Sequence, residues 1–278
     1  MPTSSISPRI AFIGGGNMAS AILGGLLRQG LPADHITVVE PFAPTRAQLE
    51  QQWAITAWPD AQAAASALAQ ADVVVWAVKP QMFRDAAAPV AAHTRQALHL
   101  SVAAGIPSAS IARWLNNARI VRAMPNTPAL IGQGMSGLFA CPQVDSAGRT
   151  LVERIMAGTG QFLWVQEETQ LDAVTALSGS GPAYVFLLLE AMTEAGTAMG
   201  LTPEQSYQLA VATFQGASAL AAQSPEDAAT LRQRVTSKGG TTHAAITHMQ
   251  AMQVPEHFKA ALERARVRAQ ELAAEFGA

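Results

Sequence analysis

One short stretch of the chain joins hydroxyl side chains to a pair of glycines, an arrangement that could bind a small anion. Its residues are Ser237, Lys238, Gly239, Gly240, Thr241 and Thr242. The hydroxyl residues favour the start of a helix, and the glycines let the backbone approach a ligand without an intervening Cβ. The N–H groups at a helix start attract anions. The stretch could therefore hold a carboxylate and leave a hydroxyl for a second polar atom, although an ordinary capped helix start would have the same composition.

A glycine-rich turn near the amino terminus lies between an expected strand and an expected helix. Residues 9–13 are β-prone, and residues 20–28 carry apolar side chains at helical spacing. The residues between these runs are Gly14, Gly15, Gly16, Asn17, Met18 and Ala19. Their G-x-G-x-x-A pattern allows a tight turn, close approach to a pyrophosphate, and packing of the helix on its strand. We predict a dinucleotide-binding turn, with a glycine turn of an unrelated α/β domain as the alternative.

Two further expected strands have a charged residue at or just after their carboxyl end. Glu40 ends the run 36–40, near the offset at which an acid can bond the adenosine ribose. Arg46 lies close by and could bind a 2′-phosphate instead. The pair Lys79-Pro80 follows the apolar run 73–78, which has the composition of a strand buried on both faces. Ligands of open α/β sheets bind at such strand ends, although solvated loop residues would give the same pattern.

Two more strand ends carry residues suited to a cofactor. The run 98–103 ends with Ala103 and is followed by Ala104 and Gly105, and small residues there leave room for a flat ring. The strand expected at 119–123 leads into Met124-Pro125-Asn126-Thr127-Pro128, where two prolines flank an Asn-Thr pair. Such a turn is stiff, and a purely structural turn remains an alternative there.

The secondary-structure pattern changes after Val165. Strand and helix signals alternate before it, so we expect an α/β dinucleotide-binding domain over residues 1–165. Only helical patterns follow, at 171–177, 184–199, 203–222, 226–235, 242–250 and 256–276. The helix at 184–199 is apolar almost all round, so it must be buried. A helical domain over residues 166–278 cannot easily enclose that helix alone, and a dimer partner is the simplest cover.

Composition limits the possible classes of function. The 278 residues are 49% hydrophobic and 14% charged, with a net charge of −2, which argues against a nucleic-acid or anionic-membrane surface. Cys141 is the one cysteine, which fits a reducing compartment. The polar start shows no signal peptide, and Glu190 and Glu194 interrupt the apolar region 182–200. We therefore expect a cytoplasmic protein that binds no membrane. The histidines lack metal-ligand spacing, so no metal is expected.

Five motifs together resemble the pyrroline-5-carboxylate reductase family over essentially the whole chain. They are Phe12–Met18, Ala77–Pro80, Met124–Ala129, Ser178–Tyr184 and Val235–Thr242. The resemblance implies a Rossmann-type α/β domain followed by an all-α dimerisation domain, with dimers that commonly assemble into decamers. It also implies the last step of proline biosynthesis. In this step a hydride passes from NADPH or NADH to the C=N carbon of L-1-pyrroline-5-carboxylate, giving L-proline.

The patterns and the resemblance together assign the site. The expected cofactor residues are Ile13, Gly14, Gly16, Asn17, Met18, Glu40, Ala77, Val78, Lys79, Pro80, Ala103, Ala104, Asn126 and Glu168. The last of these comes from the resemblance alone, which places it near the nicotinamide. The expected substrate residues are Ser237, Gly239, Gly240, Thr241 and Thr242. We expect the Thr242 hydroxyl to be the catalytic group, through a hydrogen bond to the ring nitrogen. A protonated cyclic imine is already electrophilic, so positioning is the main contribution of the protein.

The sequence departs from the family pattern at three places. Lys238 stands where many relatives have proline, and Arg234 stands where relatives tend to carry an uncharged amide. The loop 63–66 lacks the asparagine that some relatives use near the adenosine ribose. These departures leave the reaction class unchanged, but the substrate-side detail and the choice between NADH and NADPH stay open.

Two other kinds of function share part of the pattern. One is a reductase of the same build that acts on another imine, such as the six-membered homologue, or a hydroxyacid dehydrogenase. The latter normally carries a lysine in the first helices of its second domain, and residues 171–207 contain none. The other is a non-catalytic dinucleotide-sensing protein, which would not need the hydroxyls of Ser237, Thr241 and Thr242.

Overall fold

The computed structural model describes residues 7–277, and the chain divides into two compact units. Unit 1 extends to Ser180 and resumes at Ala265, whereas unit 2 comprises Gly181–Arg264. An α/β arrangement with an all-helical segment after it was predicted from the sequence and is confirmed. The domain boundary placed between residues 165 and 166 stays a prediction.

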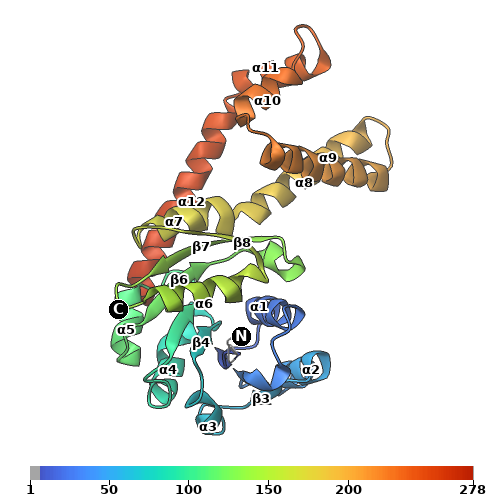
Figure 1. Cartoon of the computed structure of the whole chain (residues 1–278). Helices are drawn as coiled ribbons and strands as arrows, with labels where there is room; N and C mark the ends of the chain where they lie inside the picture. The colour runs from blue at the N-terminus through green and yellow to red at the C-terminus, as the bar shows by residue number, and fades with distance from the viewer. Residues whose placement is uncertain (1–6, 278) are drawn as a thin grey trace, which may run out of the picture. The chain divides into compact units, whose positions relative to one another are not determined.

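A mixed sheet forms the centre of unit 1 (Figure 1). Within the described residues its strands are β1 (Ile10–Ile13), β2 (Ile36–Val39), β3 (Thr56–Trp58), β4 (Val73–Trp76), β5 (Leu98–Ser101), β6 (Ile120–Met124), β7 (Gly134–Ala140) and β8 (Gly160–Trp164). They lie in the order β3-β2-β1-β4-β5-β6-β7-β8, and β6–β7 is antiparallel while the other pairs are parallel. The strand order reverses at β1, and ligands of open α/β sheets bind beyond the carboxyl ends of strands at such a point.

Helices cover both faces of this sheet. They are α1 (Asn17–Arg28), α2 (Ala43–Trp53), α3 (Ala65–Leu68), α4 (Pro80–Ala91), α5 (Ser108–Leu115), α6 (Ser146–Ala157) and α7 (Gln170–Val174), with short turns η1 (Ala33–His35), η2 (Thr127–Ile131) and the π-helical η3 (Thr175–Gly179). Phe12 and Val75 face a core that includes Ile22 of α1. Ile13 and Trp76 face the opposite core, because successive strand residues point to opposite faces. Both cores are apolar, which explains why a central strand such as β4 is apolar throughout.

The helix α3 is shorter than the composition of its segment suggests. Residues 60–70 are rich in alanine, which favours a helix, but α3 covers only Ala65–Leu68. The Asp60 carboxylate accepts a hydrogen bond from the Ala63 N–H at 2.8 Å. Residues 61–64 form a turn that leads into α3.

Unit 2 consists of helices. They are α8 (Gly181–Ala198), α9 (Pro203–Gln223), α10 (Ala228–Arg234), α11 (Thr241–Ala251) and the first part of α12 (Val254–Phe276). A capping box of Thr202 and Gln205 begins α9, and the Asp227 side chain caps α10. Leu189 is buried in α8, whereas Phe186 and Leu187 are 57% and 64% exposed. One chain therefore leaves this apolar helix uncovered, the situation that the sequence indicated would require a partner.

The last part of α12 belongs to unit 1. A Cβ on Gly105 would lie 3.1 Å from the Leu272 Cβ, so the two segments are in close contact. Arg113 Nη2 donates to the Gly277 carbonyl at 3.2 Å, and Ser110 Oγ donates to the same oxygen. Figure 1 shows this end of α12 beside α5. The carboxyl-terminal helix thus supports the segment between β5 and α5.

Candidate active site

The glycine turn after β1 has the geometry that a pyrophosphate needs. Gly14 has φ +93°, and a Cβ there would lie 2.8 Å from the Ala77 carbonyl oxygen. A Cβ on Gly16 would meet no atom within 4 Å, so the backbone faces open space there. No side chain caps the 12-residue α1 that begins next, and Ala19 is fully buried against the strand. The start of α1 is therefore an uncapped helix N-terminus that can bind a phosphate group.

Glu40 is bound to this turn. Its Oε2 accepts from the Gly15 N–H at 2.9 Å and its Oε1 from the Phe42 N–H at 2.8 Å. Arg46 Nη1 donates to the carbonyls of Glu40 and Pro41 at 2.9 and 2.8 Å. The carboxylate is thus held at the turn, while one nitrogen of the guanidinium is engaged by the backbone.

Gly15, a position that the G-x-G-x-x-A pattern does not specify, packs closely against α2. A Cβ at this position would lie 2.6 Å from Leu49 Cδ1, so the end of that side chain would have to shift. This contact comes from the packing of α2, so a pattern of local glycines does not reveal it.

Most of the other expected cofactor residues meet at one edge of the sheet. Ala77, Val78, Lys79 and Pro80 follow β4, and Ala103 and Ala104 follow β5. Parallel strands end at the same edge, so these residues lie on the side of the glycine turn. Lys79 is the N-cap residue of α4, and the proline after it stands in the first turn. The structure therefore places the predicted residues of β1, β2, β4 and β5 along one edge.

Asn126 follows β6 at this edge, but both ends of its amide are already bonded. Its Oδ1 accepts from the Met135 N–H at 2.9 Å, and its Nδ2 donates to the Ser178 carbonyl at 3.0 Å. The side chain thus joins the turn after β6 to η3. Contact of Asn126 with a cofactor stays a prediction.

Glu168 lies in a hydrogen-bonded network with Ser108, at the start of α5, and Arg122 of β6. Ser108 donates to it through its N–H and its Oγ, both at 2.6 Å, and Arg122 Nη1 donates at 2.7 Å. Burial alone would raise the pKa of the Glu168 carboxyl, but the bonds from Ser108 and Arg122 and the charge of Arg122 outweigh it. The pKa therefore lies below its usual range. The role of Glu168 beside a nicotinamide stays a prediction.

Sequence reasoning missed Ser108 and Arg122 in this network. An arginine inside the otherwise apolar strand Ile120–Met124 is the one signal that could have pointed to it. Its partner Glu168 lies 46 residues further along the chain, so no local pattern connects them.

The expected substrate residues lie together in unit 2. Gly240 is the N-cap residue of α11, no side chain caps this end, and its first turn contains no acidic residue. Gly239 has φ +76°, which favours glycine. Thr242 is the second residue of the helix rather than its cap, so its hydroxyl does not form the ordinary capped helix start that the composition of this stretch also allowed. An uncapped start of an 11-residue helix suits a carboxylate.

The two charged departures from the family pattern lie close to this segment in sequence. Arg234 forms an ion pair with Glu226, which lies just before α10. The pair therefore links the two ends of α10, and Lys238 is exposed.

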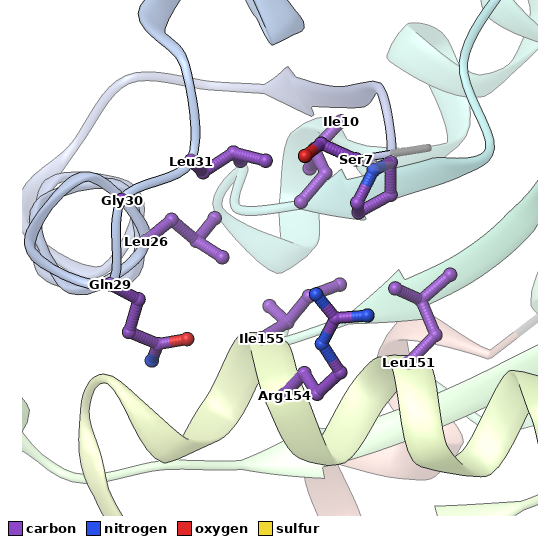
Figure 2. A pocket seen from close by; sticks show the side chains of 10 residues that line it. Ser7, Ile10, Leu26, Gln29, Gly30, Leu31, Leu151, Arg154 and Ile155 are labelled. Atoms are coloured by element: carbon purple, nitrogen blue, oxygen red, sulfur yellow. The ribbon is translucent and has the colours of Figure 1, made fainter. Parts of the chain in front are cut away.

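A small cavity of about 110 Å³ lies elsewhere in unit 1. Figure 2 shows it between the end of α1, the start of β1 and α6. Ile10 lines it, and the glycine turn follows the opposite end of the same strand. None of the described residues that line it is an expected cofactor or substrate residue.

Comparison with known proteins identifies the family. Residues 168–272 match the family described as pyrroline-5-carboxylate reductase dimerisation, and residues 9–105 match NADP oxidoreductase coenzyme F420-dependent. A pyrroline-5-carboxylate reductase of Pseudomonas aeruginosa is 46% identical, with 98% of this chain and 99% of the relative covered. The solved pyrroline-5-carboxylate reductase of Coxiella burnetii is 39% identical with a TM-score of 0.89, covering 96% of this chain and 99% of that one.

A more distant solved structure shares the fold. It is the Plasmodium falciparum pyrroline carboxylate reductase with NADP bound, 24% identical with a TM-score of 0.83, covering 96% of this chain and 98% of that one. The identity with the Pseudomonas relative extends over nearly the full length of both proteins. This chain belongs to the pyrroline-5-carboxylate reductase family.

Proposed function

We propose that this protein is an oxidoreductase that reduces L-1-pyrroline-5-carboxylate to L-proline, the last step of proline biosynthesis. The observation that carries the proposal is the presence, in one chain of this family, of two uncapped helix N-termini with different surroundings. One follows the glycine turn at the switch point of the sheet, and the other follows Gly239 and Gly240. The first suits a dinucleotide and the second a small carboxylate.

Unit 1 supplies the binding groups for the nicotinamide cofactor. A bound NADH or NADPH supplies the hydride. The backbone at Gly16 and the start of α1 would hold the pyrophosphate, because a Cβ there would meet no atom and the helix end is uncapped. Lys79 and Pro80 begin α4 beside it. Ala103 and Ala104 are small, so they leave room for a flat ring at the end of β5.

Unit 2 supplies the binding groups for the substrate. The N–H groups at the start of α11 would hold the carboxylate of the imine, and the Thr242 hydroxyl would hydrogen-bond the ring nitrogen. Ser237, Gly239, Gly240 and Thr241 shape this end of the helix. The protein would then act mainly by positioning and by excluding water, because a protonated imine needs little further activation.

NADH is the cofactor that we propose as preferred. The Glu40 carboxylate is held at the turn by two N–H groups, so it cannot easily turn away from a ribose. A 2′-phosphate would meet a like charge there. Arg46 is the nearby cation, and its Nη1 already bonds two carbonyls. Removing Glu40 should therefore improve the use of NADPH.

The family match extends to the dimerisation region, and we propose that copies of this chain form homodimers that can assemble further into decamers. We place the protein in the cytoplasm, with no nucleic acid and no membrane among its partners. The division into a dinucleotide domain over residues 1–165 and a substrate and dimerisation domain over residues 166–278 is part of the same proposal.

A steady-state assay tests the function. Oxidation of NADH and NADPH is followed with pyrroline-5-carboxylate and with its six-membered analogue, and proline is identified among the products. The expected result is turnover with a higher kcat/KM for the five-membered imine. A higher value for the six-membered imine would indicate a related imine reductase. Dinucleotide binding without turnover of either imine would indicate a sensor.

A further inference from the structure

Arg122 is a buried cation in an apolar strand. It lies in β6, level with Ser101 of β5 and Phe139 of β7, and its side chain is 11% exposed. Removing a charge from water is costly unless it is paired and hydrogen-bonded. The structure pairs this guanidinium with Glu168 at 2.7 Å.

The Glu168 carboxylate connects Arg122 to the start of α5. Glu168 Oε1 accepts from Arg122 and from the Ser108 N–H, and Oε2 accepts from the Ser108 hydroxyl. Ser108 is the first residue of α5, so the carboxylate fills the helix start as an internal anion. Three charge-assisted hydrogen bonds therefore join β6, α5 and the segment before α7.

The segment between β5 and α5, residues 102–107, is the part of the chain that this network fixes. It begins at the end of β5, passes through Ala103 and Ala104, and ends where Ser108 is bonded to Glu168. Gly105 packs against Leu272 of α12. One end of the segment is set by the sheet and the other by Glu168, so a shift of α5 would displace the two alanines.

We infer that Arg122 is a positioning residue for the nicotinamide cofactor, which acts through Glu168 and Ser108 to hold Ala103 and Ala104 in place. This inference rests on the proposed function, because it takes the β5–α5 segment as part of the cofactor site. Arg122 itself touches Glu168, and its effect on the cofactor is indirect.

The surroundings of Glu168 predict how the site depends on pH. Arg122 of β6 faces the carboxylate, Cys141 follows β7, and Asp172 lies on α7. Arg266 of α12 acts electrostatically on Asp172. Without Arg122 the effect of burial on Glu168 is opposed only by Ser108, so the pKa of Glu168 rises. The protonated carboxyl holds the N–H and hydroxyl of Ser108 less firmly.

The test compares four variants with the parent protein. Arg122→Gln removes the cation, Arg122→Lys retains it, and Ser108→Ala removes one bond to Glu168. Arg119→Gln is the matched control, because this arginine lies just before the same strand and bonds the Gln96 carbonyl instead. The dissociation constants of NADH and NADPH are measured by fluorescence titration between about pH 5 and pH 8, alongside melting temperature, kcat and KM.

Arg122→Gln should weaken dinucleotide binding by about 10- to 100-fold, with a larger loss toward acid pH, since misplacement of a binding segment has effects of this size. Arg122→Lys should recover most of the affinity, and Arg119→Gln should bind like the parent. KM for the dinucleotide should rise more than kcat falls. A folded Arg122→Gln protein with a lower melting temperature, but with parental affinity at every pH, would overturn the inference.

Ser108→Ala decides the matter if Arg122→Gln does not fold. It should weaken dinucleotide binding in the same acid-dependent way but to a smaller extent, and parental affinity at all pH values would overturn the inference. The titration uses no imine, so it tests the role of Arg122 separately from the proposed reductase activity. If the parent protein binds the dinucleotide but does not reduce the imine, the proposed function is refuted, while the effect of Arg122 on dinucleotide binding still stands.

Discussion

At the scale of single residues, Thr242 is the side chain most directly tied to the proposed chemistry. It is the second residue of α11 and does not cap the helix, so a loss of activity on mutation would not come from a lost cap. A hydrogen bond that involves a charged group contributes about 1.5–3 kcal/mol. Thr242→Ala should therefore lower kcat/KM by about 10- to 150-fold, with dinucleotide affinity and melting temperature nearly unchanged.

Steady-state kinetics beside a melting curve check this prediction. Thr247→Ala, on the same helix, serves as the control and should keep parental kinetics. A kcat/KM for Thr242→Ala within about twofold of the parent would remove Thr242 from the catalytic machinery.

Glu40 is the residue that we expect to set cofactor preference. Glu40→Ser removes a carboxylate that two N–H groups hold at the glycine turn, and with it the repulsion of a 2′-phosphate. The ratio of kcat/KM for NADPH to that for NADH should rise. Glu50→Ser, at an exposed position of α2, is the matched control and should leave the ratio unchanged. An unchanged ratio in Glu40→Ser would mean that Glu40 does not face the ribose.

His99 should make the fold sensitive to acid. Burial is the main cause that lowers its pKa from 6.5 to about 4, and its Nδ1 accepts from Trp76 Nε1 at 3.0 Å. Between about pH 6.5 and pH 4 the unfolded chain therefore binds more protons at His99 than the folded protein does. The contribution of the neutral, buried His99 to the free energy of unfolding is complete above about pH 6.5 and is lost as the pH falls toward about 4.

Between pH 7 and pH 5 this residue should account for a loss of about 2 kcal/mol in the free energy of unfolding. Urea denaturation of the parent and of His99→Asn measures it, since asparagine offers an acceptor to Trp76 but does not titrate. The variant should lose less stability on acidification. An equal loss in both proteins would assign the acid sensitivity to other groups.

At the scale of elements, the turn at the end of η3 depends on Asn126. The Ser180 N–H bonds the Thr175 carbonyl at 2.8 Å, and the Ser178 carbonyl accepts from Asn126. Asn126→Asp keeps the acceptor for Met135 but loses the donor to Ser178. We expect a loss of about 1–3 kcal/mol in the free energy of unfolding.

Faster hydrogen exchange of the amides in and just after η3 should accompany this loss. Asn116→Asp is the control, because Asn116 is exposed with φ +47° and aspartate tolerates that conformation. Parental stability and exchange in Asn126→Asp would show that the bond to Ser178 contributes nothing measurable.

The strands and most helices could be predicted from the sequence because their signals are local. Apolar runs such as Val73–Trp76 give a strand buried on both faces, and glycine after β1 gives the turn. The Arg122–Glu168 pair could not be predicted, because it joins distant segments through packing. The return of α12 to unit 1 was also missed, since helical periodicity does not say which unit a helix joins. The candidate cofactor edge was predictable because parallel strands end together.

At the scale of the whole molecule, the apolar surface of α8 requires an explanation. The segment Gln170–Ala198 is long and apolar enough, by length and composition, to cross a membrane, and 11% of its most apolar window is buried within the chain. The same segment lies wholly within the region that matches the dimerisation family, residues 168–272. Glu190 and Glu194 interrupt it, and charged groups are costly in a bilayer. A second copy of the chain is the cover that accounts for all of these features.

The purified protein should therefore be a dimer or a multiple of dimers. Leu187 is 64% exposed on α8, so Leu187→Glu would place a charge in the interface and should shift the protein toward monomer. Gln62→Glu adds the same charge at an exposed position of unit 1 and should leave assembly unchanged. Light scattering at micromolar concentration measures the mass of each protein. A parental monomer would contradict the prediction, because α8 would then have no partner to cover its apolar surface. Recovery of the parent with membranes after sedimentation would also contradict it, because a bilayer rather than a second copy would then cover α8.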